Sequence, residues 1–424
     1  MRHPGPQTPP SLDAVIVGAG VVGAACAYYA TRAGLSVAVV DRGPVAGGTT
    51  GAGEGNLLVS DKEAGPELDL ARLSIRLWRE LAEALPPEDA IEYEPKGGLV
   101  IAPDETALTA LHAFARGQRR AGVTAHEVPA DALHALEPHL APGLAGGVHY
   151  PADAQVQPAR AAAALLRAAR RAGALLRLGE EVTAVLTTPG GAVRGVRTAR
   201  GDLHAPAVVN AAGTWGGRFA ALAGTHLPVL PRRGFVLVTE PLPPGTVRHK
   251  VYAADYVTDV ASDSAALQSS AVVESTPAGP VLIGATRERV GFDRTLSTPA
   301  LRRLAAQATA LFPALADVHA IRAYCGFRPY LPDHLPAVGP DPRVPGLHHA
   351  CGHEGAGIGL APATGLLVTA ALTGAPPPLD PAPFRPDRFP PPDGPPPQAP
   401  PAHGGPSQHA APRQAGPPPP DGAP

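Results

Sequence analysis

Three glycines near the start of the chain have the spacing that holds a phosphate group. Gly18, Gly20 and Gly23 form the pattern G-x-G-x-x-G directly after the apolar stretch AVIV. In this pattern the first glycine allows a tight turn, the second lets the backbone approach a pyrophosphate, and the third lets a helix pack closely on a sheet. Val22 lies inside the pattern and is expected to line the same site. The spacing therefore predicts binding of a dinucleotide.

An acidic residue follows at the position that such a site requires. Asp41 ends the stretch SVAVVD, about 20 residues after the glycines, where a carboxylate accepts hydrogen bonds from an adenosine ribose. Arg42 comes next and is expected to border the cofactor as well. An acid here favours an unphosphorylated ribose, but it does not distinguish NAD from FAD.

A secretory or membrane segment is the alternative for the same apolar run. A signal peptide needs a basic n-region, whereas residues 1–13 contain one arginine and end with Asp13 beside the run. A membrane span needs about 20 apolar residues, but this run is shorter and holds three glycines in six positions. We therefore expect dinucleotide binding and no membrane span.

A second glycine-rich stretch, GGTTGAGEGNLLVSDK, covers residues 47–62. Thr49, Thr50 and Asn56 within it carry side chains that donate hydrogen bonds to phosphate or ring atoms. By itself the stretch has the composition of a surface loop, so its interpretation depends on the other motifs.

A third glycine-rich stretch, near the C-terminus, indicates the kind of cofactor. The sequence GLHHACGHEGAGIGLAPATG is typical of a strand, a turn containing Gly352, Gly355 and Gly357, and an apolar helix. The free backbone N–H groups at a helix start favour negative charge. A reduced flavin carries negative charge near its N1 and C2 carbonyl, whereas a nicotinamide needs no such partner. The turn therefore favours FAD.

Arg328 is a second signal in the C-terminal part of the chain. It lies among turn-forming prolines in CGFRPYLPDHLPAVGP, and its guanidinium can bind a carboxylate in a bidentate manner. Tyr256, in YAADYVTD, is a further candidate for the substrate pocket, with an ordinary core or surface tyrosine as the alternative. Upstream, the apolar strand expected over 207–211 ends in small residues, which leave room for a ligand above a sheet.

The elements that must position these residues alternate between strands and helices. A strand over 14–17, a helix over 21–32 and a strand ending at Asp41 are predicted, and a later helix begins at Pro158. The stretches RRGFVLVTE, QSSAVVEST and PVLIGATRE predict an antiparallel sheet. We predict an α/β fold with a Rossmann-like dinucleotide-binding domain and an inserted antiparallel α+β substrate domain.

Composition excludes several classes of function. The 424 residues carry a net charge of −2, so nothing indicates nucleic acid or an anionic membrane as a partner. The three cysteines form no C-x-x-C, which argues against a disulfide framework, a zinc ribbon or an iron–sulfur cluster held by this chain. No metal site is predicted, and a cytoplasmic location is expected because these cysteines suit a reducing compartment.

The C-terminal residues 375–424 are mostly Pro, Gly and Ala with isolated charges. They contain too few large apolar residues to offset the entropy of ordering, so a disordered, Pro-rich tail is predicted. A ligand of the PxxP type is the alternative function for this tail.

Together the motifs resemble the FAD-dependent amine oxidoreductases of the D-amino-acid oxidase and glycine oxidase superfamily. GAGEGNLLVSDK, GFRPYLPDHLPAVGP and GHEGAGIGLAPATG are most similar to the flavin subunits of D-hydroxyproline dehydrogenase, opine oxidase and hydrogen cyanide synthase. The resemblance covers residues 12–374 and implies a FAD-binding domain of the glutathione-reductase type. The implied segments are 12–95, 151–225 and 321–374 for FAD, 96–150 and 226–320 for the substrate, and 375–424 for the tail.

The resemblance also implies individual roles. The implied FAD contacts are Gly18, Gly20, Val22, Gly23, Asp41, Arg42, Thr49, Thr50, Gly55, Asn56, Leu57, Val182, Ala211, Gly213, Trp215, Gly352, His353, Gly355, Gly357 and Ile358. Arg328 would bind the carboxylate of a D-amino or imino acid similar to D-hydroxyproline, and hydride would pass from its α-carbon to flavin N5, giving an imine. Sarcosine, glycine and opines are the alternative substrates. Electron-accepting partner subunits or a homo-oligomer are expected, and oxidase and dehydrogenase activities both stay open.

Some residues depart from the pattern of these relatives. His334 stands where glycine is usual, and Cys351 stands where a small residue is common. Cys325 lies near the cysteine through which some sarcosine oxidases attach flavin, but its spacing to the Pro-Asp pair differs, which favours a buried, inert thiol. His353 is expected to be structural rather than catalytic.

Three other classes of protein share part of this pattern. A nicotinamide-dependent dehydrogenase would explain the first glycine motif but not the C-terminal turn or Arg328. A flavin reductase or monooxygenase would need a second nucleotide site, for which the sequence has no motif. A non-catalytic FAD-bearing subunit is harder to separate from an enzyme, and substitution of Arg328 distinguishes the two.

Overall fold

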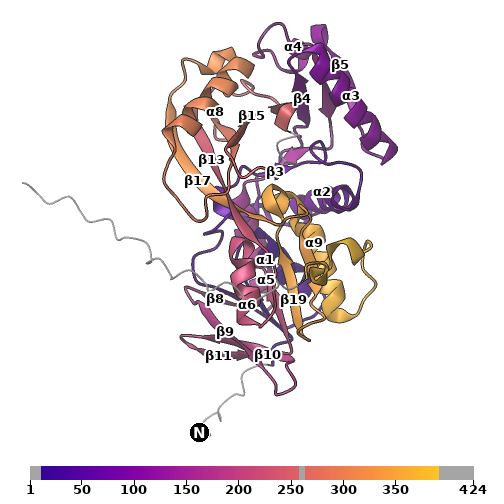
Figure 1. The fold of residues 1–424 in the computed structure, drawn as a ribbon, viewed down its shortest axis with the longest axis vertical. Coiled ribbons are helices and arrows are strands. Elements are labelled where there is room, and N and C mark those ends of the chain that lie inside the picture. The colour runs from indigo at the N-terminus through magenta and orange to yellow at the C-terminus, as the bar shows by residue number, and fades with distance from the viewer. Residues whose placement is uncertain (1–10, 257–262, 391–424) are drawn as a thin grey trace, which may run out of the picture. The chain divides into compact units, whose positions relative to one another are not determined.

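A six-stranded sheet forms the base of the nucleotide-binding region (Figure 1). The computed structural model describes residues 11–256 and 263–390. The strand order is β18-β19-β12-β1-β2-β8, and all neighbours are parallel except β18 and β19. The strands are β1 (Ala14–Val17), β2 (Val37–Asp41), β8 (Leu175–Leu178), β12 (Ala207–Asn210), β18 (Ala337–Pro340) and β19 (Leu347–Cys351). This order confirms the predicted Rossmann-like arrangement, in which β1 lies between β2 and β12.

Helices cover this sheet and enclose the larger apolar core. They are α1 (Val21–Arg32), α2 (Pro66–Ala84), α5 (Pro158–Arg171) and α9 (Gly357–Thr373). The helix α1 packs against both α5 and α9, and α9 also packs against α2. By length and composition alone, residues 354–373 would suffice to cross a membrane. Most residues of α9 are buried against these neighbours, which is the environment of a core helix.

An eight-stranded sheet forms the second part of the fold, with the order β17-β13-β16-β15-β14-β4-β6-β5. Its strands are β4 (Gly98–Ala102), β5 (His126–Pro129), β6 (Gly146–Tyr150), β13 (Leu230–Pro241), β14 (Lys250–Ala253), β15 (Gln268–Ser275), β16 (Pro280–Arg287) and β17 (Ala320–Tyr330). Neighbours are antiparallel except for β14 and β4. The helix α8 (Thr298–Leu311) packs on β15 and β16, and α3 (Glu105–Arg120) packs on β4 and β6.

The strand β17 belongs to the larger sheet, although most of its residues lie in the segment 321–374 that was predicted to bind FAD. Residues 321–330 were placed in the FAD-binding segment 321–374, but they form most of β17 and pair along their length with β13. The strand leaves the larger sheet only after Tyr330, so the polypeptide crosses between the two sheets about ten residues later than predicted. The pairing partner of a strand is a long-range property that the local sequence of β17 does not carry.

Smaller elements complete the described chain. They are β3 (Asn56–Leu57) and β7 (Ala154–Gln155), which pair with each other, the three-stranded sheet of β9 (Val182–Thr187), β10 (Val193–Thr198) and β11 (Gly201–His204), and the short helices α4 (Leu133–Leu136) and α6 (Gly216–Leu222). The β3–β7 pair joins the loop after β2 to the segment just before α5.

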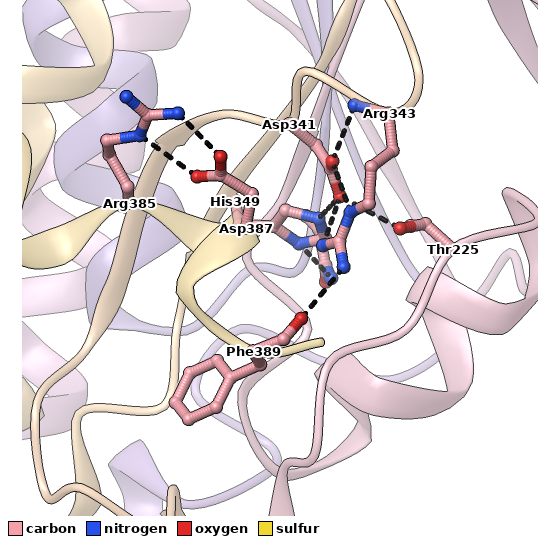
Figure 2. Close-up of polar contacts among 8 residues, drawn as sticks. Thr225, Asp341, Arg343, His349, Arg385, Asp387 and Phe389 are labelled. Atoms are coloured by element: carbon pink, nitrogen blue, oxygen red, sulfur yellow. Dashed lines mark hydrogen bonds and ion pairs between the residues drawn. The ribbon is translucent and has the colours of Figure 1, made fainter. Parts of the chain in front are cut away.

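The first part of the predicted tail is folded. Residues 375–390 contain two short 3-10 helices, and the side chain of Phe384 is fully buried in the larger core. Arg388 donates hydrogen bonds to Asp333, and Arg343 donates one to the backbone oxygen of Phe389 over 3.2 Å (Figure 2). Disorder was predicted here from average composition, but one aromatic side chain and these polar contacts anchor the segment. Residues 391–424, the rest of the predicted tail, lie outside the described residues.

Candidate active site

The backbone of the loop between β1 and α1 packs so closely on its neighbours that side chains at Gly18 and Gly23 would overlap backbone atoms. A Cβ at Gly18 would overlap the carbonyl oxygen of Ala211, and one at Gly23 would overlap the carbonyl oxygen of Gly18. Gly18 also has φ of 122°, a conformation that only glycine adopts readily. Gly20 precedes α1 and has no side chain to cap it, so the backbone N–H groups that follow Val21 in the first turn keep their partial positive charge. This geometry fits a pyrophosphate at the start of α1.

Thr50 and Thr49 hold the next loop in place in different ways. The Thr50 hydroxyl oxygen accepts a hydrogen bond from the Val21 backbone N–H over 3.0 Å, at the first turn of α1. The Thr49 hydroxyl donates to the carbonyl oxygen of Phe327 over 2.6 Å and lies 3.1 Å from the Thr214 hydroxyl. These contacts connect the loop to β17, and the contact of Thr49 with the cofactor stays a prediction.

Asp41 lies at the C-terminal end of β2 with its carboxylate fixed. One oxygen accepts from the Ala19 backbone N–H and the other from the Gly43 backbone N–H, each over 2.7 Å. Arg42 stacks on the ring of Trp215, with 4.3 Å between its Cζ and the ring centroid. The backbone N–H of Glu180 donates to the Asp41 carbonyl, which brings the start of β9 beside β2.

These contacts gather the residues predicted for the adenosine end of the cofactor. Val182 is the first residue of β9, and Ala211 follows β12 next to Gly18 and Gly23. Gly213 and Trp215 belong to the turn after β12, with Gly213 close to the Thr49 hydroxyl. The structure thus brings the N-terminal predictions together at one edge of the sheet, and their contacts to FAD stay predictions.

The residues predicted beside the flavin ring come from β3 and from the start of α9. Gly55 has φ of 101°, and a Cβ there would overlap the carbonyl oxygen of Val156. Asn56 and Leu57 form β3, and a Cβ at Gly359 would lie 3.2 Å from the Asn56 carbonyl oxygen. The side chain of Ile358 reaches the backbone of Gly53 in the preceding loop. The uncapped start of α9 therefore lies against β3.

The turn before α9 owes its shape to two residues with positive φ, Gly352 at 84° and Glu354 at 47°. His353 is buried, and its Nε2 lies 3.0 Å from the Thr364 hydroxyl. Burial lowers the pKa of His353 to about 3, so the imidazole is neutral. This environment supports the structural role expected for His353. Gly355 and Gly357 lie in the same turn, and a Cβ at Gly355 would be 3.4 Å from Arg328 Nε.

Taken together, the starts of α1 and α9, the side-chain-free glycine loops and Asp41 fit a FAD. The loops approach each other so closely that glycines are required at positions 18, 23 and 55. The positive ends of α1 and α9 suit a pyrophosphate and an electron-rich ring system, respectively.

Arg328 lies on β17 of the larger sheet, and its side chain is half-buried. Its Nη1 donates to the carbonyl oxygen of Thr286 over 2.8 Å, and its side chain passes over Gly234, where a Cβ would overlap Nη1. Burial, together with the charge of Arg287, lowers the pKa of Arg328 to about 10, so the guanidinium stays charged at neutral pH. A dehydrated guanidinium next to the turn before α9 is suited to bind a carboxylate.

Tyr256 lies in the same region. Its ring centroid is 4.8 Å from that of Tyr252, and the Cζ of Arg287 lies 4.5 Å from its own ring centroid. Burial raises the pKa of the Tyr256 phenol, which keeps it protonated. The structure therefore brings both predicted substrate residues, Arg328 and Tyr256, into one buried polar region.

Other buried charges here were not predicted. Lys250 forms an ion pair with Glu274 and a hydrogen bond with the Asn56 side chain, next to β3. Burial alone would lower the pKa of Lys250, but Glu274 and Glu54 outweigh it, so this pKa is raised.

A second group is formed by Glu354, which binds both Arg232 and His334. His334 has φ of 58°, a conformation that suits the glycine usual at this position. The sequence contained one signal for such buried charges, which was a charged residue within an otherwise apolar strand, as in RRGFVLVTE and LIGATRE.

Cys325 lies away from Arg328. Successive side chains of a strand point to opposite faces, so residues 325 and 328 of β17 face opposite ways. The Cys325 thiol contacts the Arg294 carbonyl oxygen over 3.7 Å and lines a cavity of about 410 Å³ with Arg322 and Tyr324. The thiol is half-buried, not fully buried as expected, whereas Cys351 is buried.

Comparisons with known proteins agree with this geometry. The family described as "DAO: FAD dependent oxidoreductase" matches residues 13–371. Hydrogen cyanide synthase subunit HcnC of Pseudomonas aeruginosa is 32% identical, with 87% of this chain and 94% of that protein covered. Glycine oxidase of the same organism is also 32% identical, over 87% of this chain and 96% of its own. The crystal structure of glycine oxidase from Geobacillus kaustophilus superposes with a TM-score of 0.81 at 30% identity, covering 89% of this chain and 99% of that one.

Proposed function

Because the chain belongs to the DAO family of FAD-dependent oxidoreductases, we propose that it oxidises a small amino or imino acid whose carboxylate binds Arg328. The observation that carries this proposal is the half-buried Arg328 guanidinium, which donates to a backbone oxygen and forms no ion pair with a carboxylate of the described residues. A buried cation without a counter-ion is costly unless a ligand supplies one.

We propose a D-amino or imino acid similar to D-hydroxyproline as the first substrate to examine. The similarity of three motifs to flavin subunits that act on such compounds supports this choice. Glycine and sarcosine are the alternatives suggested by the glycine oxidases among the relatives. An opine, which carries a second carboxylate, is the alternative suggested by the position of Arg287.

The residues of this chain would orient the substrate and exclude water. Arg328 would hold the carboxylate, and the buried Tyr256 ring would close one side of the pocket. FAD, when bound, accepts the hydride that leaves the α-carbon. The positive end of α9 would stabilise negative charge on a FAD bound beside it. Since the substrate enters as the neutral amine, the site needs no strong base.

Electron transfer to a partner subunit is a further part of the proposal. HcnC is named as a subunit of hydrogen cyanide synthase, and another relative, from Escherichia coli, is named as one of the subunits of anaerobic glycerol-3-phosphate dehydrogenase. We propose that this chain also works beside a protein that carries electrons away, with a homo-oligomer as the alternative, and that it does so in the cytoplasm.

The test is the absorbance spectrum of the purified, FAD-loaded chain before and after anaerobic addition of cis-4-hydroxy-D-proline. Bleaching of the flavin bands would establish amine oxidation and the catalytic competence of this chain alone. Bands that persist with this substrate, with sarcosine, with glycine and with an opine would contradict the proposal. A chain that retains no FAD after reconstitution would contradict the assignment of the glycine loops as well.

A further inference from the structure

Arg287, the last residue of β16, is a second buried guanidinium near Arg328. Its side chain is 2% exposed, and its Nη1 has no hydrogen-bond partner in the part of the chain that the structure describes. Buried polar groups are almost always hydrogen-bonded, and buried charges are normally paired. The free Nη1 therefore indicates that Arg287 has a partner that residues 11–256 and 263–390 do not supply.

Arg287 and Arg328 project from the same face of the larger sheet. Gln268 of β15 lies directly opposite Arg287, and its side-chain oxygen accepts from Arg232 over 2.8 Å. Arg232 of β13 in turn lies directly opposite Arg328 of β17. Residues directly opposite each other on neighbouring strands share a face. The two guanidinium groups thus flank one region from different strands, and Arg328 reaches toward β16 across Gly234.

The packing of Arg287 leaves its hydrogen-bonding edge available. Its Cζ lies 4.5 Å from the centroid of the Tyr256 ring. Stacking of this kind uses the flat face of the guanidinium, and the N–H groups point outward in its plane. Tyr256 therefore fixes the position of the group while the N–H fork remains free for a carboxylate.

The carboxylates that act electrostatically on Arg328 are Glu54 and Glu354. Glu354, in the turn beside Arg328, is bound to Arg232 and His334. Within residues 11–256 and 263–390, no carboxylate lies within ion-pair distance of Arg287 or Arg328. A substrate with one carboxylate would compensate one guanidinium and leave the other buried without a counter-ion.

We propose that Arg287 binds a second anionic group of the substrate, so that the enzyme prefers amines with two carboxylates to amines with one. This inference rests on the proposed function, because it assumes that Arg328 binds the first carboxylate. It narrows the substrate class to amino acids that carry a further carboxylate on the amine or the side chain. Among the candidates above it places opines ahead of D-hydroxyproline.

The test compares two ligands that differ by one carboxylate and contain no amine to oxidise. Thiodiacetate has two carboxylates, and (methylthio)acetate has one. Binding to the FAD-loaded protein is followed by the change in flavin absorbance and by calorimetry. We expect thiodiacetate to bind at least about 10-fold more tightly. In Arg287→Gln this affinity should fall about 30-fold, whereas binding of (methylthio)acetate should change by less than about 2-fold.

Further variants separate charge, geometry and folding. Arg287→Lys keeps the positive charge and should restore part of the preference for thiodiacetate. Arg302→Gln removes an exposed arginine on α8 and should change neither affinity. Arg328→Gln should weaken the binding of both ligands. An unchanged flavin spectrum and thermal midpoint in Arg287→Gln would show that the variant is folded.

Two outcomes would overturn the inference while leaving the proposed function intact. Wild-type protein that binds both ligands equally would mean that there is no second anion site. If Arg287→Gln lost the same factor of affinity for both ligands, both arginines would bind a single carboxylate. In either case sarcosine would still reduce the flavin. If no amine reduces the flavin and neither ligand binds, the proposed function fails and the second site fails with it.

Discussion

Arg328 of β17 lies across Gly234 of β13, and no other residue at position 234 would leave its guanidinium in place. The two belong to neighbouring strands, and a Cβ at Gly234 would overlap Nη1 and lie 2.5 Å from the Thr286 carbonyl oxygen. The path of the arginine to β16 therefore depends on a missing side chain in the strand between them.

Gly234→Ala is expected to lower kcat/KM for the amine substrate about 100-fold, since a displacement of about 1 Å at a binding group has effects of this size. The FAD content should stay unchanged because Gly234 is remote from the glycine loop after β1. Gly117→Ala is the control, since a Cβ at Gly117 meets no atom within 4 Å. Equal kinetics for Gly234→Ala and wild type would show that Arg328 does not need this path.

Arg328→Ala should lower kcat/KM about 1,000-fold, because it leaves the substrate carboxylate in a dehydrated site without its partner. Arg328→Lys should be intermediate, since it keeps the charge but loses the bidentate fork. The rate of anaerobic flavin reduction at several substrate concentrations measures both effects. Unchanged turnover in Arg328→Ala would place the carboxylate elsewhere.

Gly23→Ala should abolish stable FAD binding. Its Cβ would overlap the Gly18 carbonyl oxygen and lie 3.3 Å from the Ala211 side chain, so α1 would have to move away from the sheet. The ratio of flavin to protein absorbance after reconstitution is the measurement. Gly190→Ala, in the β9–β10 turn where the nearest atom is 3.8 Å away, should bind FAD normally. Full occupancy in Gly23→Ala would contradict the pyrophosphate assignment.

The His334–Glu354 contact should make stability depend on pH. The hydrogen bond to Glu354 raises the pKa of His334 above its ordinary value. A raised folded-state pKa gives a contribution that is complete below about pH 6.5 and is lost as the pH rises through the folded value. Urea midpoints of wild type and His334→Asn should therefore differ most below about pH 6.5 and converge in alkaline buffer.

Asparagine suits this comparison because it tolerates the positive φ of position 334. His204→Asn replaces an exposed histidine and should show no such dependence. A difference between wild type and His334→Asn that is constant from pH 5.5 to pH 9, or that grows with pH, would contradict the ion pair.

Asp341 should stabilise the contact between β18, β19 and the segment after α9. Burial alone would raise its pKa, but hydrogen bonds from His349 and Arg343 hold the pKa well below its ordinary value (Figure 2). Asp341→Asn should lower the free energy of unfolding by about 3 kcal/mol at neutral pH, because it breaks a buried pair. Asp317→Asn is the exposed control.

The sign of the pH dependence is opposite to that of His334. A depressed pKa gives a contribution that is complete above the ordinary value of about 4 and is lost as the pH falls through the folded value. The difference between wild type and Asp341→Asn should therefore be full at pH 7 and shrink in acid. A difference of the same size at pH 7 and at pH 3 would contradict this account.

Local sequence was sufficient for the nucleotide-binding half of the site. The spacing of Gly18, Gly20 and Gly23, with Asp41 after the next strand, predicted β1, α1 and β2, and all three are present. Short-range geometry controls these elements, since Gly18 and Gly23 are required by atoms of the same β-α-β unit or of the residue after the neighbouring strand.

The tail after α9 and the strand β17 show where local patterns failed. Composition over 375–424 predicted disorder, but the side chain of Phe384 packs in a core formed by residues far away in the sequence. Residues 321–330 were assigned to the wrong sheet because a strand's partner is chosen by the surfaces it meets, not by its own composition.

The sequence by itself determined that this chain carries a β-α-β unit with the glycine spacing of a dinucleotide site, and its resemblance to a family made Arg328 the predicted carboxylate-binding residue. Only the tertiary structure decided that Arg287 stands beside Arg328 without a partner among the described residues, that Glu354 is already bound to Arg232, and that Lys250 lies against β3. The physical reason is that a charge acquires its function from its burial and its neighbours, and both depend on how strands far apart in the sequence are paired.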